Sequence, residues 1–249
     1  YQSKEVALLH SRLNIIDLNS QSNQPFYDKD FKLIFNGEIY NYLELRNDLK
    51  KKNYTFNTNS DTEVLLKAFQ EYGEKCVDHF IGMWSFAIWD LKNKKLFLSR
   101  DPFGEKPLYY TLGHNFFFFA SEIKFIKSLC KKKFEINKDK IYENIFFGYK
   151  SLNKDESTFY KEIYSIENGT NLTIDLDLNI LKNKYWQPKA HIKKNMNAQE
   201  AAEGTNYYLT NSLKLRMRSD VPIAFCLSGG VDSGILASHA KKTFEKKIS

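Results

Sequence analysis

The sequence from Cys226 to Gly234 reads Cys-Leu-Ser-Gly-Gly-Val-Asp-Ser-Gly and says most about the fold. The apolar run Ile223–Leu227 leads into it and is typical of a fully buried parallel strand. A helical pattern follows over residues 235–240. A strand, a tight turn and a helix N-terminus form an anion site, because unpaired N–H groups converge there and the helix dipole favours negative charge. The stretch therefore predicts an α/β unit that binds an anion.

The side chains of this turn favour a phosphate as the anion. Gly229 and Gly230 let the backbone approach without a Cβ, while Ser228 and Ser233 can donate hydroxyl hydrogen bonds. Asp232 suits a turn cap or a metal ion. The turn lacks the lysine of a Walker loop. It resembles the Ser-Gly-Gly-x-Asp-Ser loop of ATP pyrophosphatases, which split ATP between its α and β phosphates; the structural alternative is an ordinary glycine turn.

Composition narrows the class of protein. The 249 residues allow one large or two modest domains, and 42% hydrophobic residues are ample for a core. The net charge of +7 comes mostly from lysines scattered among asparagines, which favours a solvated surface over nucleic-acid binding. The sequence shows neither a signal peptide nor an apolar run long enough to cross a membrane. We therefore expect partners other than nucleic acids and membranes.

The cysteines and the chain ends carry further expectations. Cys76, Cys130 and Cys226 are far apart and show no metal spacing or disulfide framework. An odd number of cysteines suits a reducing compartment, so we expect a cytoplasmic protein. The chain begins at Tyr1 without an initiator Met and ends soon after the phosphate loop, in a lysine-rich helix. We expect it to be a fragment.

The first two thirds of the chain show short apolar runs separated by turns. Strands are expected over 6–9, 32–35, 83–90, 96–99 and 116–120, and helices over 43–49, 60–69, 122–129 and 138–148. Asn36-Gly37 is a strong turn signal after the strand 32–35. Ser60 and Glu63 form a capping-box pattern. Many short strands with few helices between them predict antiparallel sheets.

The last third begins with a polar stretch. Residues 188–195 have the composition of a linker, and Asn197 with Glu200 is a capping signature for a new helix that runs to about residue 215. This pattern predicts two domains, over residues 1–187 and 196–249.

Four sequence segments, in their order and spacing along the chain, indicate a protein family. They are Arg12–Asp17, Asn36–Asn41, Ser60–Glu63 and Ser219–Ser233. With them the chain resembles glutamine-hydrolysing asparagine synthetases of the B type over essentially its whole length; residues 100–110 and 119–124 also fit that family. The resemblance implies an α+β αββα sandwich of the N-terminal-nucleophile type, followed by a truncated α/β ATP-pyrophosphatase domain.

The resemblance also implies a glutamine site. Arg12 would pair with the α-carboxylate as a bidentate fork, and Glu38 with Asp61 would accept from the α-ammonium. The Asn36 amide and the Gly37 N–H would stabilise the oxyanion. The implied glutamine-binding set is Arg12, Leu13, Asn14, Ile15, Ile16, Asn36, Gly37, Glu38 and Asp61. The structural alternatives are a surface arginine, a plain hairpin turn and helix capping.

In that family the nucleophile is an N-terminal cysteine whose own amine is the general base. Tyr1 stands first here, and we expect Cys76, Cys130 and Cys226 to be structural or incidental. A lysine next to Cys130 could lower its pKa, but nothing in the sequence places it near Asn36. We therefore expect residues 1–249 alone to release no ammonia from glutamine.

In the second domain the resemblance implies an ATP site that works with Mg²⁺. Its residues would be Leu227, Ser228, Gly229, Gly230, Val231, Asp232 and Ser233. The implied activity is synthesis of asparagine from aspartate through β-aspartyl-AMP, with glutamine as nitrogen donor; a homodimer is a further expectation. Three alternatives stay open: amidation of another carboxylate such as a sugar acid, closure of a β-lactam, or a non-catalytic glutamine or nucleotide sensor.

Overall fold

The computed structural model describes residues 1–148, 155–190, 192 and 195–244. A six-stranded sheet has the order β1-β2-β3-β4-β8-β9, and a three-stranded sheet has the order β6-β5-β7. The strands are β1 Phe26–Tyr27, β2 Phe31–Ile39, β3 Gly82–Asp90, β4 Lys95–Arg100, β5 Tyr109–Leu112, β6 Phe117–Ala120, β7 Tyr164–Ser165, β8 Thr170–Ile174 and β9 Ile180–Lys184. Every pair of neighbouring strands is antiparallel, which confirms the expected sheet type.

Two helices cover one face of the large sheet. They are α1, Tyr42–Lys51, and α2, Asp61–Tyr72. Leu49 of α1 and Leu65 of α2 pack on Trp84 of β3 in one cluster of buried side chains. The short 3-10 helices Ser20–Ser22 and Gly73–His79 lie in the connections. Apolar residues recur at helical spacing in α2 and at alternate positions in β2. Burial of these two apolar surfaces against each other holds the helices on the sheet.

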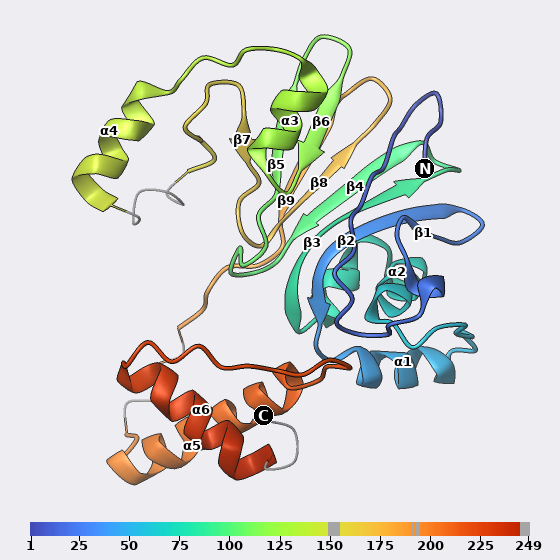
Figure 1. The fold of residues 1–249 in the computed structure, drawn as a ribbon. Helices are drawn as coiled ribbons and strands as arrows, with labels where there is room; N and C mark the ends of the chain where they lie inside the picture. The colour runs from blue at the N-terminus through green and yellow to red at the C-terminus, as the bar shows by residue number, and fades with distance from the viewer. Residues whose placement is uncertain (149–154, 191, 193–194, 245–249) are drawn as a thin grey trace.

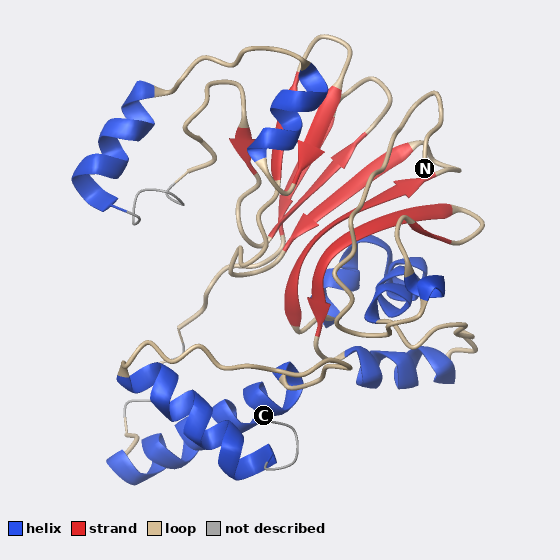
Figure 2. Cartoon of the chain, in the orientation of Figure 1, coloured by secondary structure: helices blue, strands red, loops and turns tan. Residues whose placement is uncertain are grey.

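The opposite face of the large sheet packs against the small sheet. Leu98 of β4 and Leu172 of β8 are buried there, and the partly buried Tyr110 of β5 and Phe119 of β6 pack against them. Helix α3, Ile123–Cys130, covers the outer face of the small sheet, where Ile126 meets Tyr109. The layers are therefore helix, sheet, sheet and helix (Figures 1 and 2), which confirms the predicted αββα sandwich.

The predicted turn at Asn36-Gly37 is wrong, because both residues lie inside β2. Gly37 stands opposite Trp84 of β3, and the pairing continues to Ile39. A Cβ on Gly37 would lie 2.1 Å from the backbone oxygen of Met83. Glycine is thus needed here for the close approach of two strands, rather than for a change of chain direction.

Two other local predictions need correction. Residues 6–9 form no strand: Ser3 N–H donates to Val6 O in a tight turn, and a single bridge joins Gln2 to Ala7. Ser60 caps α2 as predicted and accepts from the Thr62 N–H at 3.1 Å. The Glu63 carboxylate instead accepts from residues 57 and 58, so the capping box is not formed. Hydrogen bonds with residues 57 and 58 thus replace the bond to the Ser60 N–H that a capping box requires.

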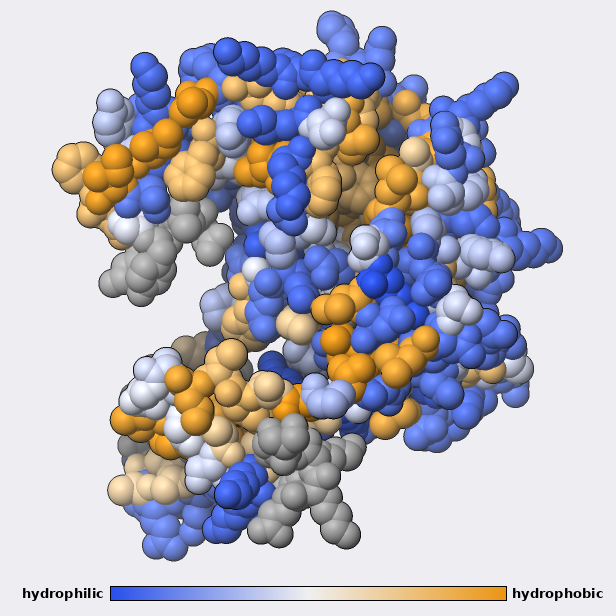
Figure 3. Space-filling view, viewed as in Figure 1, coloured by the Kyte–Doolittle hydropathy of each residue, from blue (hydrophilic) through white to orange (hydrophobic). Residues whose placement is uncertain are grey.

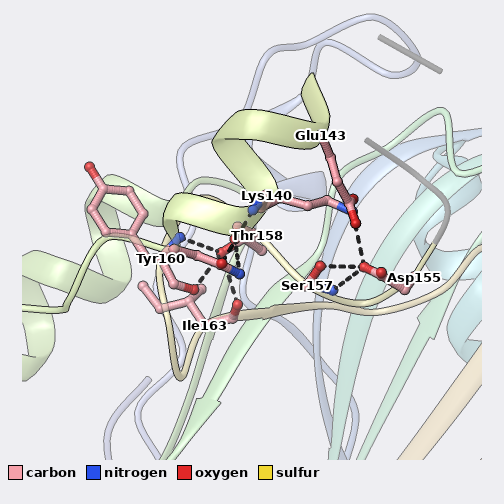
Figure 4. Close-up of polar contacts among 8 residues, drawn as sticks. Lys140, Glu143, Asp155, Ser157, Thr158, Tyr160 and Ile163 are labelled. Carbon is pink, nitrogen blue, oxygen red and sulfur yellow. Dashed lines mark hydrogen bonds and ion pairs between the residues drawn. The ribbon is translucent and has the colours of Figure 1, made fainter. Parts of the chain in front are cut away.

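Helix α4, Lys138–Phe147, stands at the edge of the sandwich. Lys140 is buried and pairs with Asp155 at 3.0 Å and with Glu143 at 3.4 Å (Figure 4). In the segment that follows Asp155, the Thr158 hydroxyl donates to Tyr160 O and Ile163 O. The helix turns apolar side chains to solvent, seen as the orange group over α4 in Figure 3, and they include Ile145, Phe146 and Phe147. Ion pairs and capping therefore hold α4 more than apolar burial does.

The second part of the chain contains two described helices, α5, Ala198–Arg216, and α6, Val231–Phe244. Asn197 and Glu200 form the predicted capping box of α5. The predicted buried strand at 223–227 is not formed within the described residues: only Ile223 is in a β-bridge, neither described sheet includes the segment, and Cys226 and Leu227 are exposed. A parallel strand needs partner strands and covering helices, and no described strand lies beside this segment. Within the described residues, no helix has the length and hydropathy to cross a membrane.

Candidate functional site

A cavity of about 1380 Å³ opens between the two sheets and reaches the end of β2. Its walls come from the 12–16 loop, from β2 and from the first turn of α2. They include, of the implied glutamine-binding residues, Arg12, Leu13, Ile15, Ile16, Asn36, Gly37, Glu38 and Asp61. Asn14 is exposed and does not line the cavity. The fold thus brings together eight side chains or backbone groups from three separate parts of the sequence.

Two carboxylates face the same end of this cavity. Asp61 is the first residue of α2, and its carboxylate accepts from the Ile39 N–H at 3.0 Å and from the Ser60 hydroxyl at 3.3 Å. Burial raises the pKa of Asp61 to about 6. Burial and the nearby charge of Asp61 raise the pKa of Glu38 to about 7, and Lys106 opposes them only in part. Such a pair attracts a cation, which would relieve the repulsion between the two carboxylates.

The Arg12 guanidinium donates hydrogen bonds to the neighbouring loop of residues 16–23. Its Nη1 donates to Asn19 O at 3.1 Å and to Asn23 Oδ1 at 3.3 Å, and its Nη2 donates to Ile16 O at 2.9 Å and also to Asp17 O. The guanidinium therefore braces residues 16–23 in this structure. A carboxylate that binds Arg12 as a bidentate fork must replace some of these neutral acceptors, and a charged acceptor makes the stronger hydrogen bond.

Two hydrogen-bond donors of β2 are directed away from β3. Phe35 N–H donates to Gln24 Oε1 and Ile39 N–H to Asp61, so the alternation along the strand places the Gly37 N–H between them on the same edge. The Asn36 amide nitrogen donates to the Ser121 hydroxyl at 3.4 Å, a long hydrogen bond. An amide and a backbone N–H at one cavity wall can together stabilise an oxyanion.

The described cysteines lie away from this cavity, because none of the three lines it. Cys76 is packed in the core beneath α2, where burial raises the pKa of its thiol far above the ordinary value. Burial also raises the pKa of Cys130, and Lys132 offsets this only in part, contrary to the lowered pKa considered from the sequence. Cys226 is exposed rather than buried in a strand. The sequence expectation that these cysteines are structural or incidental fits their positions.

The loop at residues 228–233 joins a short extended segment to α6. Ser228 Oγ and Ser233 Oγ lie 3.1 Å apart, and the Ser233 hydroxyl also donates to Gly230 O at 3.1 Å. Gly229 has a φ of +81°, which L side chains rarely adopt, and open space lies where its Cβ would be. Loop and helix are exposed, and this arrangement leaves room for a ligand at the start of α6.

Comparison with known proteins decides the family. Residues 1–186 match the family described as glutamine amidotransferase domain. The chain belongs to this family. Residues 205–249 match the family described as asparagine synthase, so the amidotransferase domain is followed by the start of an asparagine synthase domain. Both matches agree with the resemblance seen in the sequence.

The chain is similar to several curated relatives of this amidotransferase family. Asparagine synthetase [glutamine-hydrolyzing] 1 of Bacillus subtilis is 37% identical over 97% of this chain and 38% of its own length. A putative asparagine synthetase [glutamine-hydrolyzing] 2 of Methanocaldococcus jannaschii is 37% identical over 94% of this chain and 48% of its own. Amidase chry2 of Gibberella zeae is 31% identical over 93% of this chain and 34% of its own. The chain spans less than half the length of these relatives.

Several residues at or near the cavity were not predicted from the sequence. Gln24 bonds with both backbone groups of Phe35, and Lys106 lies near the carboxylate pair. His10 also lines the cavity, and burial followed by the charge of Arg12 holds its pKa below the ordinary value. Ser121 lies in the 119–124 stretch that fitted the amidotransferase resemblance, which was its only signal. Gln24 had no signal, since a single glutamine in a polar loop predicts nothing.

The raised pKa of Glu38 makes a prediction for stability. Its pKa in the folded protein lies above the ordinary 4.5, so ionisation of Glu38 opposes folding, and the free energy of unfolding falls as pH rises from about 4.5 to 7. Glu38→Gln should therefore raise the free energy of unfolding at pH 8 by about 1–2 kcal/mol, after a discount for partial exposure, and by less than half of that at pH 5.

Urea unfolding of Glu38→Gln and wild type at the two pH values measures this effect. Glu203→Gln, an exposed change on α5, is the matched control and should shift stability equally at both pH values. A Glu38→Gln gain that did not grow with pH would show that Glu38 is not under electrostatic strain.

Proposed function

We propose that the full-length protein hydrolyses glutamine at this cavity and uses the ammonia, with ATP, to amidate aspartate through β-aspartyl-AMP. The observation that carries the first half is the cavity itself. One end holds two carboxylates with raised pKa values, the wall holds a guanidinium, and β2 supplies two oxyanion donors. An α-amino acid with a side-chain amide has groups complementary to all three.

The carboxylates account for recognition of the α-ammonium. An ammonium between Glu38 and Asp61 would lower both pKa values and favour the charged form of each carboxylate. Because the pKa of Glu38 is raised to about 7 without ligand, this residue is partly protonated at neutral pH, and binding of an ammonium beside it would release that fraction of a proton.

The oxyanion donors account for the chemical step. Attack on the side-chain amide of glutamine turns its carbonyl oxygen into an oxyanion, which the Asn36 amide and the Gly37 N–H would stabilise. The Asn36 amide has two N–H donors, so it can donate one to the oxyanion while its long bond with Ser121 uses the other. The attacking group in this family is an N-terminal cysteine by resemblance, and the described cysteines of this chain do not reach the cavity.

The second half of the proposal concerns the 228–233 loop. The positive φ of Gly229 and the open space at its Cβ position allow a phosphate to reach the backbone at the start of α6. Asp232 in the first turn of α6 provides one carboxylate. Mg²⁺ is commonly held by one or two carboxylates with the substrate phosphates, so Asp232 would help to hold a Mg²⁺ bound with ATP, whose charge would favour departure of pyrophosphate.

A glutamine analogue without the α-amino group tests the glutamine half. 4-Carbamoylbutanoate has the same carboxylate and amide but no ammonium. We expect its kcat/KM for ammonia release by the full-length protein to be at least about 30-fold below that of glutamine, since loss of a buried charged partner costs about 2–5 kcal/mol. Equal kcat/KM values for the two compounds would contradict the role of Glu38 and Asp61.

Amidation of a different carboxylate is the second candidate for the acceptor. What raises it is that relatives of this chain do not all carry the name asparagine synthetase: one, 31% identical over 93% of this chain, is named as an amidase. Pyrophosphate release by the full-length protein with aspartate, and then with a panel of other carboxylates, separates the two candidates. Release that depends on aspartate supports asparagine synthesis, and release only with another acid supports the second candidate.

A further inference from the structure

The segment of residues 216–222, which leads from α5 toward the phosphate loop, lies against the amidotransferase domain near α1 (Figure 1). Arg218 Nη1 donates to Tyr40 O at 2.7 Å, and its guanidinium pairs with the Glu44 carboxylate at 2.5 and 2.6 Å. Arg216 lies over the Tyr40 ring, and Met217 is buried. Several independent contacts thus dock this segment on the first domain.

Asp220 makes a different kind of contact from the same segment. Its N–H donates to Ile15 O at 3.0 Å, and its carboxylate Oδ2 accepts from the Asp17 N–H at 2.7 Å. One residue therefore holds both ends of the Ile15–Asp17 peptide. Ile15 and Ile16 line the cavity, so this peptide is part of the wall of the glutamine site.

The peptide held by Asp220 has a constrained shape. Asp17 has a φ of +58°, a left-handed conformation that costs free energy for a residue other than glycine. The Asp17 carboxylate accepts from the Ser22 hydroxyl and the Asn59 N–H, both at 2.8 Å, and Arg12 donates to its carbonyl oxygen. Asp220 supplies the acceptor for its N–H, and it is the partner that comes from the far end of the chain.

We propose that Asp220 is a positioning residue of the glutamine site, supplied by the segment that leads into the phosphate loop. The inference rests on the proposed function, because it assigns the 15–17 peptide to glutamine binding. Asp220 touches no substrate. It holds the 15–17 peptide so that Ile15, Ile16 and Arg12 present the correct wall to the amino-acid end of glutamine, and the glutamine site is complete only with the 216–222 segment docked.

The test uses the full-length protein and three variants. Asp220→Ala removes the carboxylate and should raise the KM for glutamine about tenfold, with kcat for hydrolysis within about twofold of wild type. Asp220→Asn keeps an acceptor oxygen and should stay within about threefold in KM. Glu44→Gln is the matched control: it breaks the Arg218 pair at the same interface, an exposed ion pair of small energy, and should leave KM within about twofold.

Amide hydrogen exchange of the 15–17 peptide, without any substrate, gives a second readout. We expect exchange of the Asp17 amide to be at least about tenfold faster in Asp220→Ala than in wild type and in Glu44→Gln. Unchanged exchange in Asp220→Ala, or equal rises in KM for Asp220→Ala and Glu44→Gln, would overturn the positioning role. Wild-type protein that hydrolyses no glutamine while the exchange result holds would overturn the proposed function alone.

Discussion

Arg12→Ala in the full-length protein should lower kcat/KM for glutamine hydrolysis by about 30-fold or more. Under the proposed function, the change removes the charged partner of the α-carboxylate, a contact worth about 2–5 kcal/mol, with each 1.4 kcal/mol equal to tenfold. It also removes the donors that brace the backbone carbonyls of Ile16, Asp17 and Asn19. Steady-state ammonia release over a range of glutamine concentrations measures the loss.

Arg12→Lys separates charge from geometry in the same assay. Lysine keeps a positive charge but cannot form the bidentate fork, so its kcat/KM should fall between those of wild type and Arg12→Ala. If Arg12→Ala hydrolysed glutamine as well as wild type, the guanidinium would serve only the 16–23 loop, and its assignment to glutamine binding would fail.

Gly229→Val should lower ATP-dependent synthesis at least about 100-fold with either glutamine or ammonium as nitrogen source. A β-branched residue is strongly disfavoured at the φ of +81° found here, and its side chain would occupy the space through which a phosphate reaches the backbone. The cavity lies in the other domain, so ammonia release from glutamine should persist. Pyrophosphate release and ammonia release, measured on the same preparation, follow the two activities.

Gly204→Val is the matched control for this change. Gly204 lies within α5, its φ is ordinary, and no atom stands within 4 Å of its Cβ position. The control should keep synthesis within about twofold, because valine is no worse than glycine in a helix. Equal losses of synthesis in the two variants would show that a valine in this part of the chain disturbs folding generally, and would contradict the phosphate role of the loop.

Most strands and helices of the first domain were predictable from the sequence because their signals are periodic. Apolar residues alternate or run together in 83–90 and 96–99, and they recur at helical spacing after Ser60. Such patterns report which face is buried and predicted antiparallel sheets, whereas the αββα sandwich was implied by the family resemblance. The N-caps Ser60 and Asn197 were equally local and were found as predicted.

The failures share one physical cause: tertiary partners, present or absent among the described residues, decide whether a local preference is realised. Asn36-Gly37 carries the local signal of a turn, but pairing with β3 keeps it extended. The apolar run 223–227 has the composition of a buried strand, but no described strand pairs with it. A pattern in one segment cannot reveal whether its partner exists.

Some residues of the candidate site were predictable from the sequence, and others were found only in the structure. Arg12, Glu38 and Asp61 were identified through resemblance, and the structure adds that they line one cavity and that the two carboxylates have raised pKa values. Gln24 had no signal, and Asp220 had only its place in the segment Ser219–Ser233, which carries the family resemblance but assigns Asp220 no contact. Asp220 meets Asp17 across 203 positions of sequence, and no periodicity or motif spans such a separation.

The proposed function requires two separate sites in the protein, one for glutamine and one for ATP. Synthesis measured as pyrophosphate release, with glutamine or with ammonium as donor, tests it on Arg12→Ala and Gly229→Val together. We expect Arg12→Ala to lose synthesis with glutamine and to keep it with ammonium, whereas Gly229→Val should lose both and still hydrolyse glutamine. Folded Arg12→Ala protein that lost synthesis equally with both donors would contradict it.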